Sequence, residues 1–192
     1  MPAPDKSPYL SAYADILKEL INRIFQKYGK FQFSQDPEIH RRDIMEYQRH
    51  MRVSGLEKFN APAYVAAVSL YRSQKDAEIH HACGVLVVYI LDQNLKKFFE
   101  AVGITGFDED DPEAVMKKCV EFSQTIAAEF KQELIHKGYP ELFTSPPAAS
   151  RNTIDEGVEF SFDQYEKAEV GFFVKKVKSL VLDITLVNLP HR

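Results

Sequence analysis

The order of hydrophobic patterns along this chain predicts an α+β fold, in which long helices pack on one face of a mostly antiparallel sheet. Two long stretches carry apolar residues at three- and four-residue spacing, which is the period of an amphipathic helix. Between them lie two runs rich in β-branched and aromatic residues, joined by a short polar segment, which predict a hairpin. Further runs of this second kind follow the second long helix, so we expect the chain to end in strands.

The elements before the middle of the chain follow a simple order. The periodicity of residues 9–28 predicts an amphipathic helix, and Gly29 is expected to end it. Residues 63–71 and 79–91 form the two strands of the hairpin. Residues 92–103 then form a second, shorter helix with a glycine as its stop.

The segment 31–59 is harder to assign, because many charges separate its few apolar residues. Two alternatives stay open: a short surface helix, or a partly ordered insertion. After the central helix, we expect strands over four runs: residues 142–144, 158–162, 170–174 and 180–186.

The central helix is expected to run from Pro112 to near Lys137. Asp111 can cap its first turn, and proline suits the first helical position. Gly138 provides a stop after the last turn. One broad apolar stripe follows the helical period: Val115, Met116, Cys119, Val120, Phe122, Ile126, Ala127, Phe130 and Leu134.

The opposite side of this helix carries Lys117, Glu121, Gln124 and Ala128. Glu121 and Gln124 are three residues apart, so their side chains are neighbours. We therefore expect a carboxylate and a carboxamide to project together into solvent from a rigid rod. An ordinary solvated helix face explains the same spacing.

Composition excludes several classes of protein. The 192 residues carry a formal charge of −4 and a pI of about 5.9, so a duplex nucleic-acid binder is not expected. No apolar run is long enough to cross a bilayer, and the first residues do not resemble a secretory signal. Cys83 and Cys119 both lie in apolar-periodic segments, which favours buried thiols in a reducing compartment, although a disulfide stays open. We expect a cytoplasmic protein.

The sequence contains no complete motif for binding a metal ion or a nucleotide phosphate, and none for a nucleophilic serine. His81 and Cys83 would share one face of a strand, with His80 on the other, and two ligands do not complete a zinc site. The acidic loop 106–111 lacks the glycine and the distal glutamate of a calcium loop. The sequence also contains no glycine-rich phosphate loop and no G-x-S-x-G elbow.

The central helix resembles the CheC/CheX family of chemotaxis phosphatases. The family carries a glutamate and an asparagine three residues apart on a helix, an apolar continuation, and a proline after a fixed gap. The corresponding residues here are Glu121 and Gln124, then the segment 126–128, then Pro147. The order of hairpin, helices and closing strands is similar over residues 53–186. The resemblance implies a single CheX-like domain over residues 1–192, with an insertion at 31–52.

This resemblance implies a partner and a mechanism. Proteins of the family dock this helix on the phosphorylated receiver domain of a response regulator. Glu121 would pair with the regulator's lysine, and Gln124 would orient the water that attacks the aspartyl phosphate. The receiver domain supplies Mg²⁺, so the chain would need no cofactor of its own. The surface that meets the partner would comprise Lys117, Glu121, Gln124, Ala128 and Pro147.

Two departures from the family pattern leave the activity open. Gln124 stands where the family has asparagine, and Lys117 stands where it has an acidic residue or serine. A non-catalytic interaction module of the same fold is therefore an alternative to an aspartyl-phosphate phosphatase, and an unrelated enzyme is a third. The resemblance and the apolar run 180–186, which would offer an unprotected edge, also lead us to expect a homodimer or a pseudo-symmetric pairing of sheets.

Overall fold

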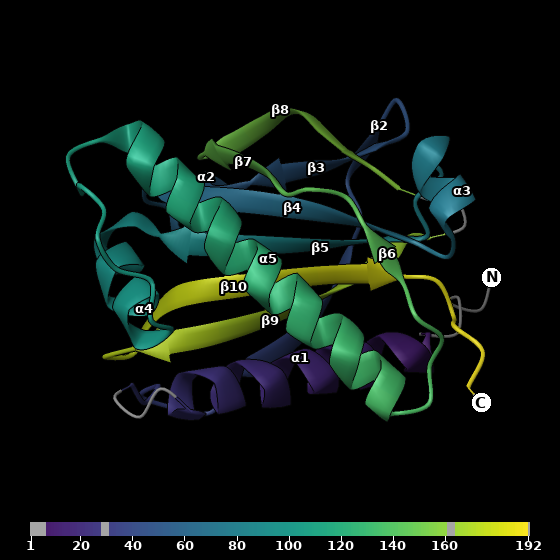
Figure 1. Cartoon of the computed structure of the whole chain (residues 1–192), viewed down its shortest axis with the longest axis horizontal. Coiled ribbons are helices and arrows are strands. Elements are labelled where there is room, and N and C mark those ends of the chain that lie inside the picture. The colour runs from purple at the N-terminus through teal and green to yellow at the C-terminus, as the bar shows by residue number, and fades with distance from the viewer. Residues whose placement is uncertain (1–6, 28–30, 161–163, 192) are drawn as a thin grey trace.

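The computed structural model describes residues 7–27, 31–160 and 164–191, which form an α+β arrangement (Figure 1). The helices are α1 Pro8–Lys27, α2 Gly55–Phe59, α3 Gln74–Glu78, α4 Leu95–Ala101 and α5 Pro112–His136, with a 3-10 turn at Asp92–Asn94. The strands are β1 Glu38–Asp43, β2 Glu46–Tyr47, β3 His50–Ser54, β4 Ala63–Tyr71, β5 Gly84–Leu91, β6 Phe143–Thr144, β7 Ala148–Arg151, β8 Thr153–Glu159, β9 Glu166–Val174 and β10 Val177–Leu186.

Seven of the described strands form one main sheet. Its order is β1-β9-β10-β5-β4-β6, and β7 also pairs with β4. All of these pairs are antiparallel. The predicted hairpin is therefore present as β4 and β5, and the two closing strands are present as β9 and β10. The helical layer and the antiparallel sheet confirm the predicted fold class.

Helices α1, α4 and α5 cover one face of the main sheet, and the larger core lies between these layers (Figure 1). Apolar side chains alternate along β9 and β10 toward the helices, as the two-residue period of a strand requires. They are Ala168, Val170, Phe172, Leu180, Leu182 and Ile184. The core also contains a group of packed phenylalanine rings: Phe25, Phe31, Phe33, Phe98, Phe122 and Phe172.

The other face of the main sheet is covered as well. Strands β2, β3 and β8 form a small sheet, and together with α2 they pack over β4, β5 and β10. A second, smaller apolar cluster fills this space, and it includes Met51, Val53, Val65, Val87 and Val181. Toward β9 the apolar cluster ends, and charged side chains take its place.

The segment 31–59 is not a short surface helix over most of its length, so that alternative is wrong. It forms β1 and β3, and only residues 55–59 are helical. The sequence of β1, Glu-Ile-His-Arg-Arg-Asp, is rich in charge because β1 is an edge strand, with its partner β9 on one side alone. Whether the segment 31–52 is an insertion relative to other CheX-like proteins stays a prediction.

The position of β10 contradicts the argument for an unprotected edge. Residues 180–186 lie in the middle of the main sheet, between β9 and β5. The edges are instead β1 on one side and the β6 and β7 segments on the other. The homodimer stays a prediction, but it loses this structural support.

Three further details differ from expectation or lie beyond the structure. Residues 79–83 precede β5 instead of belonging to it, and the polar connection before them contains α3. Strand β8 begins at Thr153, earlier than expected, and leaves out Phe160. Tyr28, Gly29 and residues 161–163, on which two of the expected boundaries fall, lie outside the described residues.

The outer edge of β4 is closed by two short strands with a break between them. Prolines at 146 and 147 have no N–H to donate, so a continuous strand cannot form there. Ser145 compensates at the break: its N–H donates to the Ser69 carbonyl at 3.0 Å, and its Oγ accepts from the Ser69 N–H at 3.0 Å. This arrangement holds β6 and β7 along the edge of β4, with β7 beside α5.

Candidate functional site

The candidate site lies on helix α5. The local sequence determines both ends of this helix. The Asp111 carboxylate accepts a hydrogen bond from the Glu113 N–H at 2.9 Å, and Pro112 occupies the first turn. Gly138 follows with a φ of 86°, a left-handed conformation that favours glycine. The predicted helix from Pro112 to near Lys137 is confirmed.

The two sides of α5 differ as the periodicity predicts. Its buried side faces the main sheet with Val115, Cys119, Phe122, Ser123, Ile126, Ala127, Phe130 and Leu134. Met116 and Val120, which we placed in the apolar stripe, are half-buried at its margin. The exposed side carries Lys117, Glu121, Gln124 and Ala128. The prediction that both polar groups are exposed is confirmed.

Glu121 is exposed but not unpaired. Its carboxylate accepts from the Lys118 Nζ at 2.8 Å, and the side chains are 51% and 26% exposed, with Glu121 the more open. The Thr125 hydroxyl donates to the Glu121 carbonyl at 3.0 Å, four residues back along the helix. An exposed pair of this kind contributes about 0–1 kcal/mol, so a competing cation can replace Lys118 at little cost.

Gln124 presents its carboxamide to solvent one turn along the helix from Glu121. Within the described residues, no side chain or carbonyl is hydrogen-bonded to that group. A carboxamide offers one acceptor oxygen and two N–H donors while remaining neutral. The group can therefore bind and orient a water molecule or a partner's polar group.

Pro147 belongs to the flank of the helix instead of its exposed face. It is half-buried and immediately precedes β7, and β7 packs against α5 (Figure 1). The break in the edge strand already explains a proline at this position. The structure thus brings Lys117, Glu121, Gln124 and Ala128 together on one helix face, with Pro147 on the neighbouring segment.

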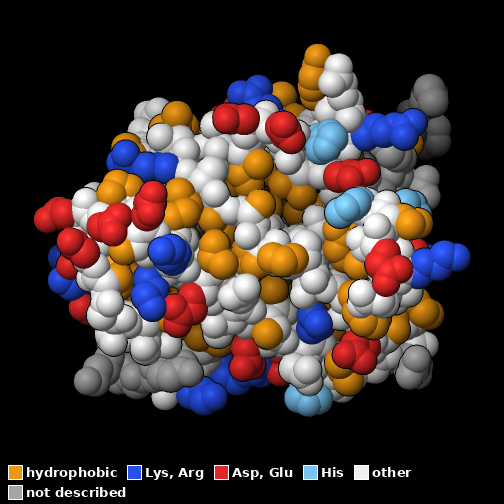
Figure 2. Space-filling model, turned by 45° about the horizontal axis from the view of Figure 1, so that its top comes forward, with side chains coloured by type: hydrophobic (Ala, Val, Ile, Leu, Met, Phe, Trp, Pro, Cys, Tyr) orange, Lys and Arg blue, Asp and Glu red, His pale blue; other side chains and the backbone are white. Residues whose placement is uncertain are grey.

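Figure 2 shows the surface around this helix from above. Acidic and basic side chains are interspersed, with hydrophobic side chains in a band between them. Exposed acids gather at the loop before α5 and in its first turn, among them Asp108, Asp110 and Glu113. The surface therefore offers contacts of both signs around the candidate site.

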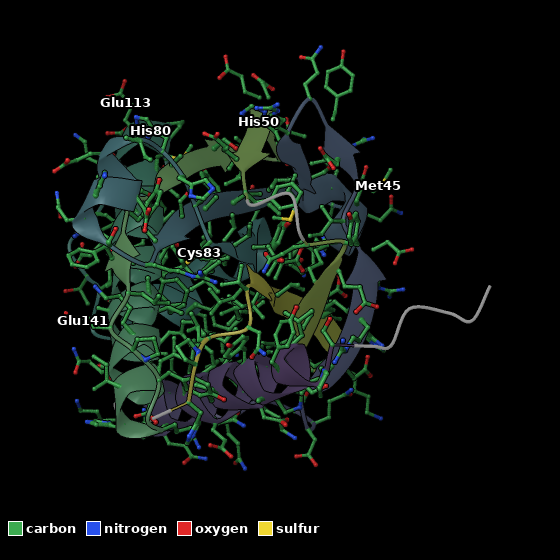
Figure 3. The ribbon with its side chains drawn as sticks, turned by 90° about the vertical axis from the view of Figure 1, so that its right-hand side faces the viewer. Met45, His50, His80, Cys83, Glu113 and Glu141 are labelled. Carbon is green, nitrogen blue, oxygen red and sulfur yellow. The ribbon has the colours of Figure 1, made fainter. Side chains whose placement is uncertain are left out.

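The histidine and cysteine group does not form a site. His80 and His81 are exposed in the turn after α3, whereas Cys83 points into the interior (Figure 3). Within the described ranges, no three histidine, cysteine or acidic side chains are placed to hold a metal ion. Both cysteines are free and buried. Burial raises the pKa of the Cys83 thiol to about 11 and also raises that of Cys119, so neither is activated as a nucleophile.

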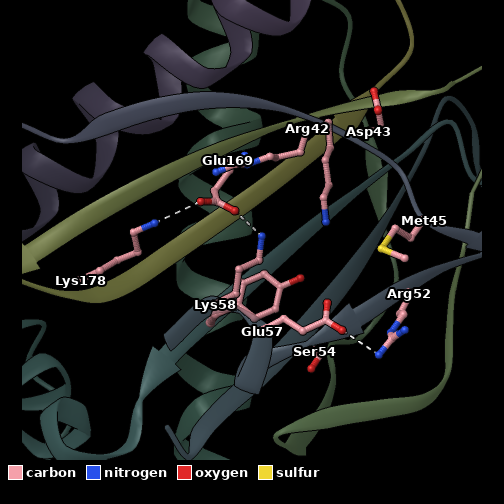
Figure 4. A pocket seen from close by; sticks show the side chains of 11 residues that line it. Arg42, Asp43, Met45, Arg52, Ser54, Glu57, Lys58, Glu169 and Lys178 are labelled. Atoms are coloured by element: carbon pink, nitrogen blue, oxygen red, sulfur yellow. Dashed lines mark hydrogen bonds and ion pairs between the residues drawn. The ribbon is translucent and has the colours of Figure 1, made fainter. Parts of the chain in front are cut away.

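A group of buried charges on the opposite face of the main sheet was missed by the sequence analysis. Asp183 is fully buried and accepts hydrogen bonds from Lys58, Lys167 and Tyr89 at 2.8, 2.7 and 3.0 Å. Glu169 accepts from Lys58 at 2.5 Å (Figure 4). A signal was present in the sequence, because Asp183 stands between leucine and isoleucine in an otherwise apolar strand.

Burial and neighbouring charges together shift the pKa values of these side chains. Burial alone would raise the pKa of Glu169, but the charges of Lys58 and Lys178 outweigh it and lower that pKa. Burial likewise opposes the charged form of Lys58, yet Asp183 and Glu169 together raise its pKa. Burial, reinforced by Asp183, raises the pKa of Tyr89 well above its ordinary value. These charges therefore stabilise one another inside the fold.

No protein-family model matches this sequence, and no curated protein matches it significantly. No helix of the described residues is long and apolar enough to cross a membrane. The informative comparison is therefore with solved structures.

Several solved structures share the fold at low sequence identity. A CheC-like superfamily protein from Shewanella sp. PV-4 has a TM-score of 0.57 and 12% identity, over 90% of this chain and 95% of that one. The chemotaxis protein CheX from Desulfovibrio desulfuricans has a TM-score of 0.55 and 11% identity, over 91% and 99%. FliY from Thermotoga maritima has a TM-score of 0.51 and 14% identity, over 98% and 94%.

These similarities show the fold. The chain has a CheC/CheX-like architecture, as its central helix and the order of its elements predict. Identities near one in ten carry no information about individual site residues, and a fold alone does not determine an activity.

Proposed function

We propose that this CheC/CheX-like protein docks, through the exposed face of α5, on the phosphorylated receiver domain of a response regulator and accelerates hydrolysis of its aspartyl phosphate. One observation carries the proposal. Glu121 and Gln124 project together into solvent from a rigid helix, and the Gln124 carboxamide is unengaged within the described residues. Two polar groups on a 25-residue rod of about 38 Å can enter a partner's active site without reorganising the fold.

The chemistry needs positioning more than covalent help. The water oxygen attacks phosphorus, the bond from phosphorus to the aspartyl oxygen breaks, and the products are inorganic phosphate and a free carboxylate. Gln124 would accept a hydrogen bond from the water and hold it in line with the departing oxygen. A group that only positions a water molecule is effective because it removes orientational freedom before the reaction.

Glu121 would provide the docking charge. A lysine of the receiver domain would replace Lys118 as the partner of its carboxylate, because the internal pair is exposed and weak. The new pair would lie at the centre of an interface, where a charge-assisted hydrogen bond contributes more than it does in open water. Binding would then align Gln124 with the phosphoryl group.

A second candidate is an interaction module of the same fold without catalysis. Glutamine is one methylene longer than the family's asparagine and has one more rotor, so its amide costs more entropy to fix in place. The ion pair of Lys118 with Glu121 also fits a face that binds a partner without chemistry. The two candidates differ in phosphate release and agree on docking.

The experiment measures phosphate release from phosphorylated receiver domains, with Mg²⁺ present, using those encoded beside this chain. We expect wild type to accelerate release, and Gln124→Ala to lower that acceleration by about a hundred-fold with docking nearly unchanged. Glu121→Ala should also weaken docking, by about ten-fold. Gln124→Asn should retain or raise activity, because it keeps the amide.

The same helix provides a matched control. Glu129 and Gln132 repeat the spacing of Glu121 and Gln124 eight residues later, about 12 Å farther along the rod and rotated by about 80° about its axis. Both are exposed. Glu129→Ala and Gln132→Ala should leave docking and phosphate release unchanged. If wild type accelerates no receiver domain and Gln124→Asn restores nothing, the interaction module is the correct candidate.

A further inference from the structure

A pocket of about 270 Å³ opens on the face of the main sheet opposite α1 and α5 (Figure 4). Its walls come from β1, β3, α2, β5, β9 and β10, segments far apart in the sequence. The Tyr89 ring forms part of the wall, and the exposed Met45 lies at the rim. The pocket is thus formed mainly by strands and a helix of the main fold, and not by a surface loop.

Three lysine ammonium groups converge on its inner wall from three different elements. Lys58 comes from α2, Lys167 from β9 and Lys178 from β10. Lys58 and Lys178 reach the two oxygens of Glu169 from two sides, at 2.5 and 3.3 Å (Figure 4). Lys167 bonds Asp183 behind them at 2.7 Å. The ammonium groups are therefore held by carboxylates that are themselves buried.

The charges of this inner group do not cancel. Three ammonium groups face two carboxylates, Glu169 and Asp183, which leaves a formal charge of +1. The rim adds the pair of Arg52 with Glu57, which is neutral, and the neighbours Arg42 and Asp43. Lys58 and Lys167 are largely buried and Lys178 is half-buried, and a net positive charge on such side chains is costly unless an anion balances it.

The ammonium groups also retain donors. Each lysine has three N–H donors. Among the described residues, Lys167 uses one of them, Lys178 one and Lys58 two. Asp183 already accepts from two lysines and from Tyr89, so it cannot take up the rest. All three lysines line the pocket, so their remaining donors are available to a group bound there.

The backbone makes room for one of these lysines. Gly171 has no side chain, and the stem of Lys178 lies over it, with Cε 3.4 Å from where a Cβ would be. A Cβ alone would make ordinary van der Waals contact with that stem, whereas a branched side chain such as valine would displace the lysine from the sheet and from Glu169. Glycine in the interior of a strand weakens it, so its presence here marks a close approach.

We propose that this pocket binds a small anion that carries a phosphate group. Tetrahedral oxygens can accept hydrogen bonds from ammonium groups that arrive from several directions, whereas a carboxylate is matched best by a planar guanidinium. The volume lies just under the usual range for ligand pockets, so the ligand is a small phosphate monoester or inorganic phosphate. The site is separate from α5 and needs no receiver domain.

The test is a titration of the wild-type chain with inorganic phosphate and with glycerol phosphate, at constant ionic strength, followed by calorimetry and by amide chemical shifts. We expect saturable binding, with shifts concentrated in α2, β9 and β10. Lys178→Gln should raise the Kd by about ten-fold or more, because it removes a charge-assisted hydrogen bond. Gly171→Val should also weaken binding, although it changes no charge.

Lys175→Gln is the matched control. It removes the same charge from an exposed position in the turn before β10, outside the pocket, and should leave the Kd within about two-fold. Circular dichroism of each variant separates lost binding from lost folding. Arg42→Gln removes a charge from an exposed position on the rim and leaves the buried ion pairs intact. It therefore tests binding at the pocket without disturbing the charges inside the fold.

Three outcomes would overturn the proposal. Phosphate binding equal in wild type and Lys178→Gln would place the anion elsewhere. Malonate binding tighter than phosphate would reassign the site to carboxylates. Absence of saturable binding of any of these anions would leave the charges a purely structural role. Glu121→Ala and Gln124→Ala should not alter this binding, so its result is independent of the proposed phosphatase.

Discussion

At the scale of single residues, Asp183 is the most constrained side chain of the molecule that sequence analysis overlooked. It lies at the centre of β10, fully buried, and three donors converge on its two oxygens. A buried carboxylate is tolerated only when it is paired and hydrogen-bonded. Lys58 and Lys167 in turn need the Asp183 carboxylate, because it compensates their buried charges.

We expect Asp183→Ala to lower the free energy of unfolding by about 3–5 kcal/mol, because it leaves two buried ammonium groups short of a partner. Denaturant titration measures this change. Asp155→Ala removes the same group from an exposed position on β8 and should cost less than about 0.5 kcal/mol. Equal midpoints for the two variants would contradict the assigned role of Asp183.

At the scale of elements, the candidate site depends on α5 being formed before any partner arrives. Packing of its apolar side against the main sheet supplies most of that order, and the N-terminal cap supplies the rest. Because Glu121 lies in the third turn, fraying at the cap should stop short of it.

Asp111→Ala should destabilise the protein by about 1 kcal/mol and speed hydrogen exchange of the first-turn amides. Exchange at Glu121 and Gln124 should change little. Asp110→Ala is the control, since this neighbour lies before the helix and its side chain caps nothing in the described structure. If exchange accelerated along all of α5, the helix would depend on its cap far more than its packing indicates.

The elements also show where the sequence is informative. The periodic stripe of α5 and the apolar runs of β4, β5 and β10 each match one structural period, so pattern analysis found them. Strand β1 was missed because an edge strand needs little hydrophobicity and carries charge. Strand β7 was missed because two prolines precede its four residues, and proline usually demotes a strand.

The candidate site likewise has features that the sequence predicts and features that it does not. Exposure of Glu121 and Gln124 follows from helical spacing and could be predicted. The ion pair of Glu121 with Lys118 also follows from helical spacing, because the two residues are three apart. The pocket of lysines could not be predicted, because its charges come from strands and a helix that only the folded chain brings together.

At the scale of the whole molecule, the buried charges couple stability to pH at both ends of the range. The pKa of Glu169 lies below its ordinary value of 4.5, so it contributes stability above that pH and loses it as the pH falls through the folded value. The pKa values of Tyr89 and Lys58 lie above 10.0 and 10.5. Their contribution is complete below those values and is lost as the pH rises.

Burial also raises the pKa values of the Cys83 and Cys119 thiols from their ordinary value of 9.0, so we expect a plateau of stability between about pH 5 and pH 9, with a decline on either side. Glu169→Gln should make the acid limb shallower, and Tyr89→Phe should make the alkaline limb shallower. Denaturant midpoints measured from pH 3 to about pH 11 test both. Glu156→Gln, an exposed acid on β8, should leave the profile unchanged. An acid limb that persists unaltered in Glu169→Gln would show that other carboxylates control it.

The central place of β10 has a consequence for biosynthesis. Every strand that β10 joins precedes it in the chain, so a ribosome has produced β5 and β9 before the strand that links them exists. Until that moment the hairpin of β4 and β5 and the strand β9 have no common partner, and their apolar faces are accessible to other chains. Nascent chains of this protein should therefore depend on chaperones until β10 has left the ribosome.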